Sequence, residues 1–232
     1  MSVVADFVSV LKQIVQVLRK DLLIEWRARS RAFALACFAL TILLLFSFAV
    51  GPDTAALRQH AGAYLWLSLL LSSTLLLDRS FQIEVESGAM ETLVLAPTNQ
   101  AAVYYGKALS NALQLSLLAA LMFPAVLALF DGRLDGSPLL LGVGLVLGCA
   151  GLSAPGTLYA ALTARLNSRQ LLLPLLLFPL IVPCLLASVK ATTLVMTGDP
   201  MNQVDSWLKL LLAFDVVYWA VCGVLFGKVI DA

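Results

Sequence analysis

Charged side chains are scarce in this sequence. Asp, Glu, Lys and Arg make up 12% of its 232 residues, whereas 61% are hydrophobic and the mean hydropathy is +0.94. A soluble globular domain has about 25% charged and 45–50% apolar residues. The shortage therefore excludes an ordinary soluble domain and predicts a protein that exposes much of its surface to lipid. The net charge of +1 gives no indication of a nucleic-acid partner.

The sequence also lacks the motifs of enzymes and of resident cofactors. It has no GxxxxGK[ST] nucleotide loop, no HExxH, no GxSxG and no cluster of histidines and cysteines with metal-ligand spacing. We therefore expect no catalytic, metal-binding or cofactor-binding residues. Any energy input has to come from another protein.

Cysteine and histidine are few and isolated. The four cysteines lie in apolar runs and no two form CxxC or CxxCH, so neither a disulfide framework nor covalent haem attachment is expected. The single histidine, His60, is expected in an external loop. Histidine can ligate haem iron, so a haem contact is one interpretation, and a solvated loop residue is the ordinary alternative.

Six apolar runs account for most of the chain. A helix needs about 20 residues to cross the hydrocarbon core of a bilayer, and the runs are close to this length. The sequence predicts one all-α polytopic membrane domain over residues 1–232, with spans at about 32–50, 63–77, 107–130, 139–163, 171–189 and 207–227.

An amphipathic helix precedes the first span within residues 1–31. Apolar residues recur every three or four positions, as at Leu11, Ile14, Leu18 and Leu22, and polar residues occupy the other side. Such a helix lies in the membrane interface with its basic side chains toward anionic headgroups. The alternative is a soluble helix packed on a partner.

Basic residues are unevenly distributed between the two ends of the spans. With the N-terminus in the cytoplasm, eleven of the fifteen Lys and Arg lie on the cytoplasmic side, and four lie on the other side, namely Arg58, Arg133, Lys190 and Lys209. Cytoplasmic loops carry the excess of Lys and Arg. We therefore expect both termini in the cytoplasm, as an even number of spans requires.

The longest cytoplasmic connection is the loop at about 78–106. Residues 87–95 can form a short helix with acidic residues such as Glu91 and an apolar end at Leu93 to Leu95, which Pro97 terminates. A short helix with acidic and apolar faces is suited to docking into a groove of another protein. An ordinary interfacial loop is the equal alternative.

Asp215 is the one carboxylate deep inside an expected span. A charge at that depth costs about 2.5–3.5 kcal/mol on insertion scales, which makes the residue a functional candidate. Structural hydrogen bonding or placement near the interface is the alternative. If Asp215 is functional, the chain could be a stand-alone, proton-coupled secondary transporter. A lipid-modifying enzyme is a further rival, which the absence of clustered polar or metal-binding residues disfavours.

Several segments resemble one known family. Residues 77–81 read LDRSF, acidic Glu84 and Glu86 follow, and residues 88–97 read GAMETLVLAP; RKDLL at 19–23 and LFPLIVP at 177–183 also match. On these segments the chain resembles the heme exporter protein B (CcmB) family, membrane subunits of the ABC transporter for cytochrome c maturation. Departures from the family pattern are Ile83, Met90 and the stretch 188–190.

The resemblance implies an ABC-2-like permease in the bacterial inner membrane. It would form a dimer with a second copy of itself and bind two copies of a cytoplasmic ATPase, which supplies ATP hydrolysis. The segment 81–97 would be the coupling helix on that ATPase, with the residues Phe81, Glu84, Glu86, Gly88, Glu91, Leu93, Leu95 and Pro97.

The resemblance also implies how haem is handled. A partner membrane subunit with a tryptophan-rich external motif would hold haem, which passes to a periplasmic haem chaperone. Haem would therefore be a transported or handed-over ligand, and ATP would act through the partner. Whether this subunit carries haem through itself, or drives release of the loaded chaperone, stays open.

Overall fold

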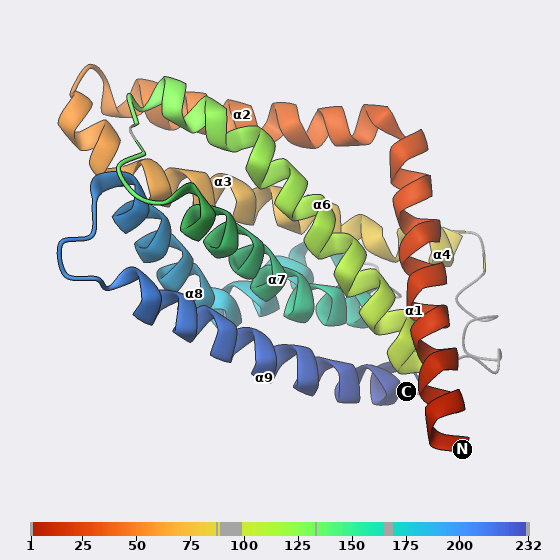
Figure 1. Cartoon of the computed structure of the whole chain (residues 1–232). Helices are drawn as coiled ribbons and strands as arrows, with labels where there is room; N and C mark the ends of the chain where they lie inside the picture. The colour runs from red at the N-terminus through yellow and green to blue at the C-terminus, as the bar shows by residue number, and fades with distance from the viewer. Residues whose placement is uncertain (1, 87, 89–98, 133, 165–168, 231–232) are drawn as a thin grey trace.

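The computed structural model describes the chain except for residues 1, 87, 89–98, 133, 165–168 and 231–232. The described residues form helices and contain no strand, as the sequence predicts (Figure 1). The helices are α1 (Ser2–Arg27), α2 (Arg29–Val50), α3 (Thr54–Ser80), α4 (Gln82–Glu86), α6 (Gln100–Leu129), α7 (Pro138–Thr163), α8 (Arg169–Thr197) and α9 (Val204–Ile230).

Six of these helices are long and apolar enough to cross a membrane, namely α2, α3, α6, α7, α8 and α9. They lie side by side in one bundle, and the connections between α2 and α3, α6 and α7, and α8 and α9 lie at the same end (Figure 1). Both chain ends lie at the opposite end (Figure 1). The predicted all-α, six-span membrane architecture is confirmed.

Helix α1 lies crosswise over the end of the bundle that holds the termini (Figure 1). Ile14 and Val17 face Gly106 of α6, where a Cβ on the glycine would come within 2.7 Å of Val17 Cβ. On another side of α1, Val8, Leu11, Val15 and Trp26 remain exposed. A crosswise helix that keeps an apolar stripe exposed beside the spans has the geometry of an interfacial helix.

Helix α3 begins earlier in the chain than the expected span at 63–77. Asp53 caps it, because its Oδ1 accepts hydrogen bonds from the backbone N–H groups of Ala55 and Ala56 at 3.0 and 3.2 Å. The added first turns face the bundle through Leu57 and Ala61, which are buried. His60 therefore lies inside α3, not in a loop, with its ring 6.1 Å from that of Tyr64.

Helix α8 also runs longer than the expected 171–189 and continues to Thr197. It accommodates Pro174, Pro179 and Pro183 without ending. Its last turns pack against the start of α3, where a Cβ on Gly62 would lie 2.6 Å from Thr193 Oγ1. This contact between α3 and α8 buries residues at the ends of both helices that hydropathy alone assigns to loops.

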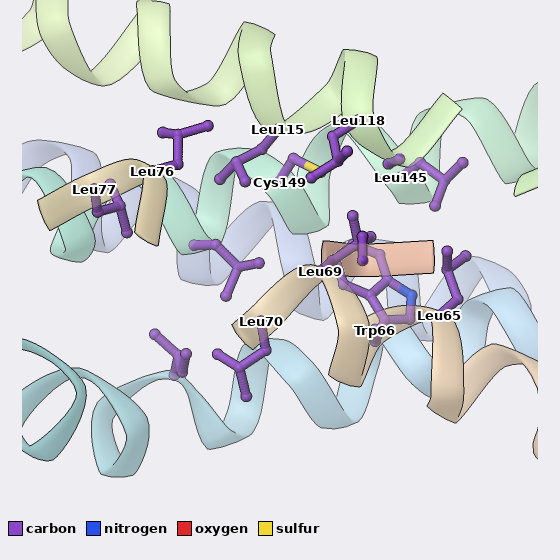
Figure 2. Close-up of a cluster of buried hydrophobic side chains, with 14 of the residues drawn as sticks. Leu65, Trp66, Leu69, Leu70, Leu76, Leu77, Leu115, Leu118, Leu145 and Cys149 are labelled. Atoms are coloured by element: carbon purple, nitrogen blue, oxygen red, sulfur yellow. The ribbon is translucent and has the colours of Figure 1, made fainter. Parts of the chain in front are cut away.

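The core of the bundle is a layer of leucines around Trp66. Leu65, Trp66 and Leu69 of α3 meet Leu115 of α6 and Cys149 of α7, all nearly or fully buried (Figure 2). The indole N–H of Trp66 donates to Thr192 Oγ1 of α8 at 2.9 Å, which satisfies its one polar group. Gly148 lies directly against the Trp66 ring, so α7 approaches α3 closely.

Candidate functional site

Four charged residues from three helices meet at the end of the bundle that holds the termini. They are Lys20 and Asp21 of α1, Glu84 of α4 and Lys107 of α6, called here the ionic cluster. The Glu84 Oε1 atom lies 2.8 Å from Lys20 Nζ and 2.9 Å from Lys107 Nζ. Asp21 lies 3.2 Å from Lys20 and 3.4 Å from Lys107. Two positive and two negative charges therefore balance at one point.

Lys107 is the most enclosed member of the ionic cluster, with its side chain only 2% exposed. Its ammonium also donates to the backbone carbonyl of Ser80 at 2.7 Å and lies 4.7 Å from the centroid of the Phe81 ring. A buried ammonium needs such partners, because loss of hydration costs several kcal/mol. Lys107 therefore fixes the end of α3 and the start of α4 to α6.

The ionisation of Glu84 follows from these contacts. Burial alone would raise the pKa of its carboxyl, but the Lys107 charge and the hydrogen bonds from Lys20 and Lys107 outweigh burial, and the pKa lies below its ordinary value. Burial alone would lower the pKa of Lys20, but the hydrogen bond from Lys20 to Glu84 and the nearby charge of Asp21 outweigh burial, and the pKa of Lys20 lies above its ordinary value. Glu84 and Lys20 are therefore both charged near neutral pH.

A polar network extends from the ionic cluster along α6. Asn111, one turn after Lys107, donates to Ser80 Oγ at 3.1 Å and to Thr157 Oγ1 of α7 at 2.9 Å. Ser110 and Gln114 continue the same side of the helix and are joined at 3.1 Å. Motion at α4 would reach α1, α6 and α7 through these bonds.

The structure describes part of the segment 81–97, which the family resemblance implies is a coupling helix. Phe81 is buried and its ring centroid lies 6.1 Å from that of Phe226, while Glu84 is buried in the ionic cluster. Gly88 is exposed with φ of +68°, a conformation that glycine adopts without steric cost. Glu86 ends α4. The remaining predicted residues, Glu91, Leu93, Leu95 and Pro97, lie outside the described residues.

Sequence reasoning missed Lys20, Asp21 and Lys107 as partners of Glu84. One readable signal was the row Lys107, Ser110, Asn111 and Gln114, which places polar groups on one side of an otherwise apolar helix. Polar residues on one face of a membrane helix mark a buried polar contact. No comparable signal connects Lys20 or Asp21 to a residue more than sixty positions away.

Asp215 belongs to a different region of the bundle, near the middle of α9. It is 6% exposed, and neither of its carboxylate oxygens has a hydrogen-bond partner among the described residues. A Cβ on Gly151 of α7 would lie 2.9 Å from Asp215 Oδ1 and 2.5 Å from Cys184 Sγ. Asp215 therefore lies in the packed contact between α7, α8 and α9.

The described residues contain no group of three His, Cys, Asp or Glu side chains arranged to hold a metal ion. The features that remain are a six-span apolar bundle, a crosswise N-terminal helix and a buried ionic cluster that includes Glu84 of α4. Together they define an all-α polytopic membrane protein.

Comparison with known sequences gives the family. The profile of the family described as CcmB protein matches residues 12–230, and the chain belongs to this family. It is 34% identical to "Heme exporter protein B" of Bradyrhizobium diazoefficiens over 80% of this chain and 82% of that protein. It is 39% identical to the protein of the same name from Rhodobacter capsulatus, over 73% and 77%, and 36% identical to that from Paracoccus denitrificans, over 84% and 89%.

Proposed function

We propose that this chain is the membrane permease subunit of an ATP-driven exporter that serves haem delivery in c-type cytochrome biogenesis. The family match over residues 12–230 and the relatives' shared name, "Heme exporter protein B", support the haem-export part. The chain itself would catalyse no reaction. ATP hydrolysis would reside in two copies of a cytoplasmic ATPase bound to a permease dimer.

The attachment of α4 is the single observation that carries the coupling part of this proposal. Glu84 is joined to Lys20 of α1 and Lys107 of α6 at 2.8 and 2.9 Å. Force applied to the segment 81–97 would therefore act on the crosswise helix and on a span at the same time. A loop held only by its two chain ends would instead absorb such a force by bending.

Residues 81–97 would be the docking element for the ATPase. Its acidic residue Glu91 would bond to basic or backbone donors of the partner, and Leu93 and Leu95 would add apolar contact. The remaining partners we propose are a membrane subunit with a tryptophan-rich external motif, which holds haem, and a periplasmic haem chaperone. The location is the inner membrane, with both termini in the cytoplasm.

Charge reversal in the segment 81–97 tests this assignment. Glu91→Lys should weaken ATPase recovery on pull-down of the permease, because an interfacial carboxylate that loses its partner costs about 2–5 kcal/mol when buried. Leu93→Asp should have the same effect, and cytochrome c assembly should fall in both. Membrane abundance, measured by blotting, should stay normal, since the segment lies outside the lipid.

Asp135→Lys provides the matched control. It reverses an exposed acidic charge in the connection between α6 and α7, at the opposite end of the bundle, and should leave ATPase recovery unaltered. If Glu91→Lys and Leu93→Asp behave like this control in both assays, the segment 81–97 is a linker and the coupling assignment is wrong.

The alternative function is a secondary transporter that uses Asp215. The burial of this carboxyl without a hydrogen-bond partner among the described residues is the observation that favours it. If ATP drives the exporter, Asp215→Asn should leave cytochrome c assembly measurable. Complete loss of assembly at normal protein abundance would favour the proton-coupled carrier.

A further inference from the structure

An open apolar groove of about 550 Å³ lies where α1 turns into α2 and both meet α6. Trp26 and Leu22 form one wall, Leu35 of α2 lies beside them, and Leu117, Leu118 and Leu121 of α6 form the other wall. Leu117 and Leu121 are 64% and 60% exposed, so side chains of the bundle do not fill the groove. Its volume falls within the range of about 300–1,000 Å³ found for small-molecule pockets.

The groove continues into a smaller polar cavity of about 60 Å³ beside the ionic cluster. The two share four lining residues: Glu25, Leu35, Leu76 and Gln114. A ligand in this space would therefore meet a polar wall at one end and a leucine wall along the other. That division fits an amphipathic molecule better than a uniformly apolar one.

The groove and the polar cavity together are lined by four basic and three acidic side chains, a small surplus of positive charge. Arg29 lines the groove, and Arg31 and Arg79 line the polar cavity. Among the described residues no salt bridge engages any of these three guanidinium groups, whereas Lys20 and Lys107 are already balanced by Asp21 and Glu84. Glu25 is the one acidic side chain that lines the space and has no part in the ionic cluster. The surplus favours an anionic headgroup.

The position of the groove specifies the source of that anion. Arg29 and Arg31 stand in the first turn of the span α2, directly after the crosswise helix α1. The end of a span is where lipid headgroups meet the hydrocarbon core. Basic pockets between helices at this depth bind anionic lipid headgroups. An aromatic ring beside the cation, here Trp26 with its ring centroid 5.9 Å from Arg29 Cζ, is typical of this layer.

We propose that this groove is a binding site for one anionic phospholipid. An acyl chain lies along Leu117, Leu118 and Leu121, and the phosphate lies where the groove meets the polar cavity, with Arg29 on the groove side and Arg31 on the cavity side. Haem is also amphipathic and anionic, but neither cavity is lined by a histidine, methionine, cysteine or tyrosine that could ligate its iron. A second copy of the chain is a poor occupant, because a symmetric contact at this groove would bring two sets of arginines together, and their like charges repel. The site does not depend on the coupling function proposed above.

Native mass spectrometry of the full chain tests the site. The purified protein is reconstituted in nanodiscs that contain equal amounts of phosphatidylglycerol and phosphatidylcholine with matched acyl chains. Lipid that remains bound after the nanodisc is stripped should be enriched in phosphatidylglycerol. Arg29→Gln and Arg31→Gln should each lower this enrichment about fivefold, equivalent to about 1 kcal/mol per basic residue. Leu117→Trp should reduce retention of both lipids by filling the groove.

Lys209→Gln is the control, because it removes an exposed basic charge at the start of α9, at the opposite end of the bundle. It should leave the enrichment unchanged. Equal retention of the two lipids by the wild type overturns the proposal, as does an equal loss of enrichment in Lys209→Gln and Arg29→Gln. Leu117→Trp could instead abolish a dimer or the binding of haem and leave lipid retention unaffected. That result would show that another occupant fills the groove, and it would also overturn the proposal.

Discussion

At the scale of single residues, Lys107 is the side chain on which the end of the bundle depends. It is 2% exposed and lies within 3.4 Å of both carboxylates of the ionic cluster. Buried charges are tolerated only when their partners are present, since removal of one partner leaves the other uncompensated. The intact cluster can therefore add little net stability, whereas the loss of Lys107 would leave buried carboxylates without their cation.

We therefore expect Lys107→Met to destabilise the protein by about 3–5 kcal/mol, because Glu84 loses its most buried cation. Thermal unfolding of the detergent-solubilised chain, followed by a fluorescent fusion reporter, would measure the effect. Lys209→Met, which removes an exposed lysine, should have little effect. The double variant Lys107→Met with Glu84→Gln should recover part of the loss, and a double variant no better than Lys107→Met would contradict this account.

At the scale of helices, close approach is decided by small residues in α7. Gly148 and Gly144 have the GxxxG spacing, but their surroundings differ, since a Cβ on Gly144 would meet Leu208 at an ordinary 3.5 Å. A Cβ on Gly148 would overlap the Trp66 ring and come within 2.6 Å of Ser188 Oγ. The spacing is common in membrane helices, and the structure shows that here Gly148 serves packing within one chain.

Gly148→Ala should therefore separate α7 from α3 and α8 and destabilise the bundle by about 1–3 kcal/mol, the usual cost of overpacking. Gly142→Ala is a control in the same helix, where the new methyl meets nothing within 4 Å. It should be neutral or stabilise by up to about 1 kcal/mol, because alanine forms helix better than glycine. Equal melting temperatures for the two variants would refute the close-approach argument.

At the scale of the whole molecule, the chain is a bundle with two unlike ends. One end holds both termini, α1, α4 and the ionic cluster, and the other holds three connections (Figure 1). At that second end, Arg58 Nε donates to the backbone carbonyl of Asp131 at 2.8 Å, which ties α3 to the connection after α6. Most Lys and Arg belong to the first end, which the positive-inside rule assigns to the cytoplasm.

Reporter fusions test this orientation directly. A fluorescent protein after the last residue should fluoresce, as it does in the cytoplasm, and alkaline phosphatase inserted at Gly132 should be active, as it is in the periplasm. The reason is the eleven-to-four distribution of basic residues between the two ends. A C-terminal phosphatase fusion that is active in the periplasm would reverse the predicted topology.

Local sequence patterns were enough to predict the number of spans, the all-α class and the amphipathic pattern of α1. These properties depend on local hydropathy and on the period of apolar residues, which a short window of sequence contains. The start of α3 escaped this reasoning, because Arg58, Gln59 and His60 lower the local hydropathy. Only the buried positions of Leu57 and Ala61 and the cap at Asp53 explain why the helix begins at Thr54.

Which charges meet depends on how distant helices pack. Lys20 and Glu84 are 64 positions apart, and Asp21 and Lys107 are 86 apart, so no local pattern relates them. Their contact results from the packing of α1 across α6, which Gly106 permits by leaving room for Val17. Asp215 shows the same difference between local and long-range information. Its position in an apolar run predicts that it lies inside a span, whereas its burial against Gly151 and Cys184 follows from how α7, α8 and α9 pack.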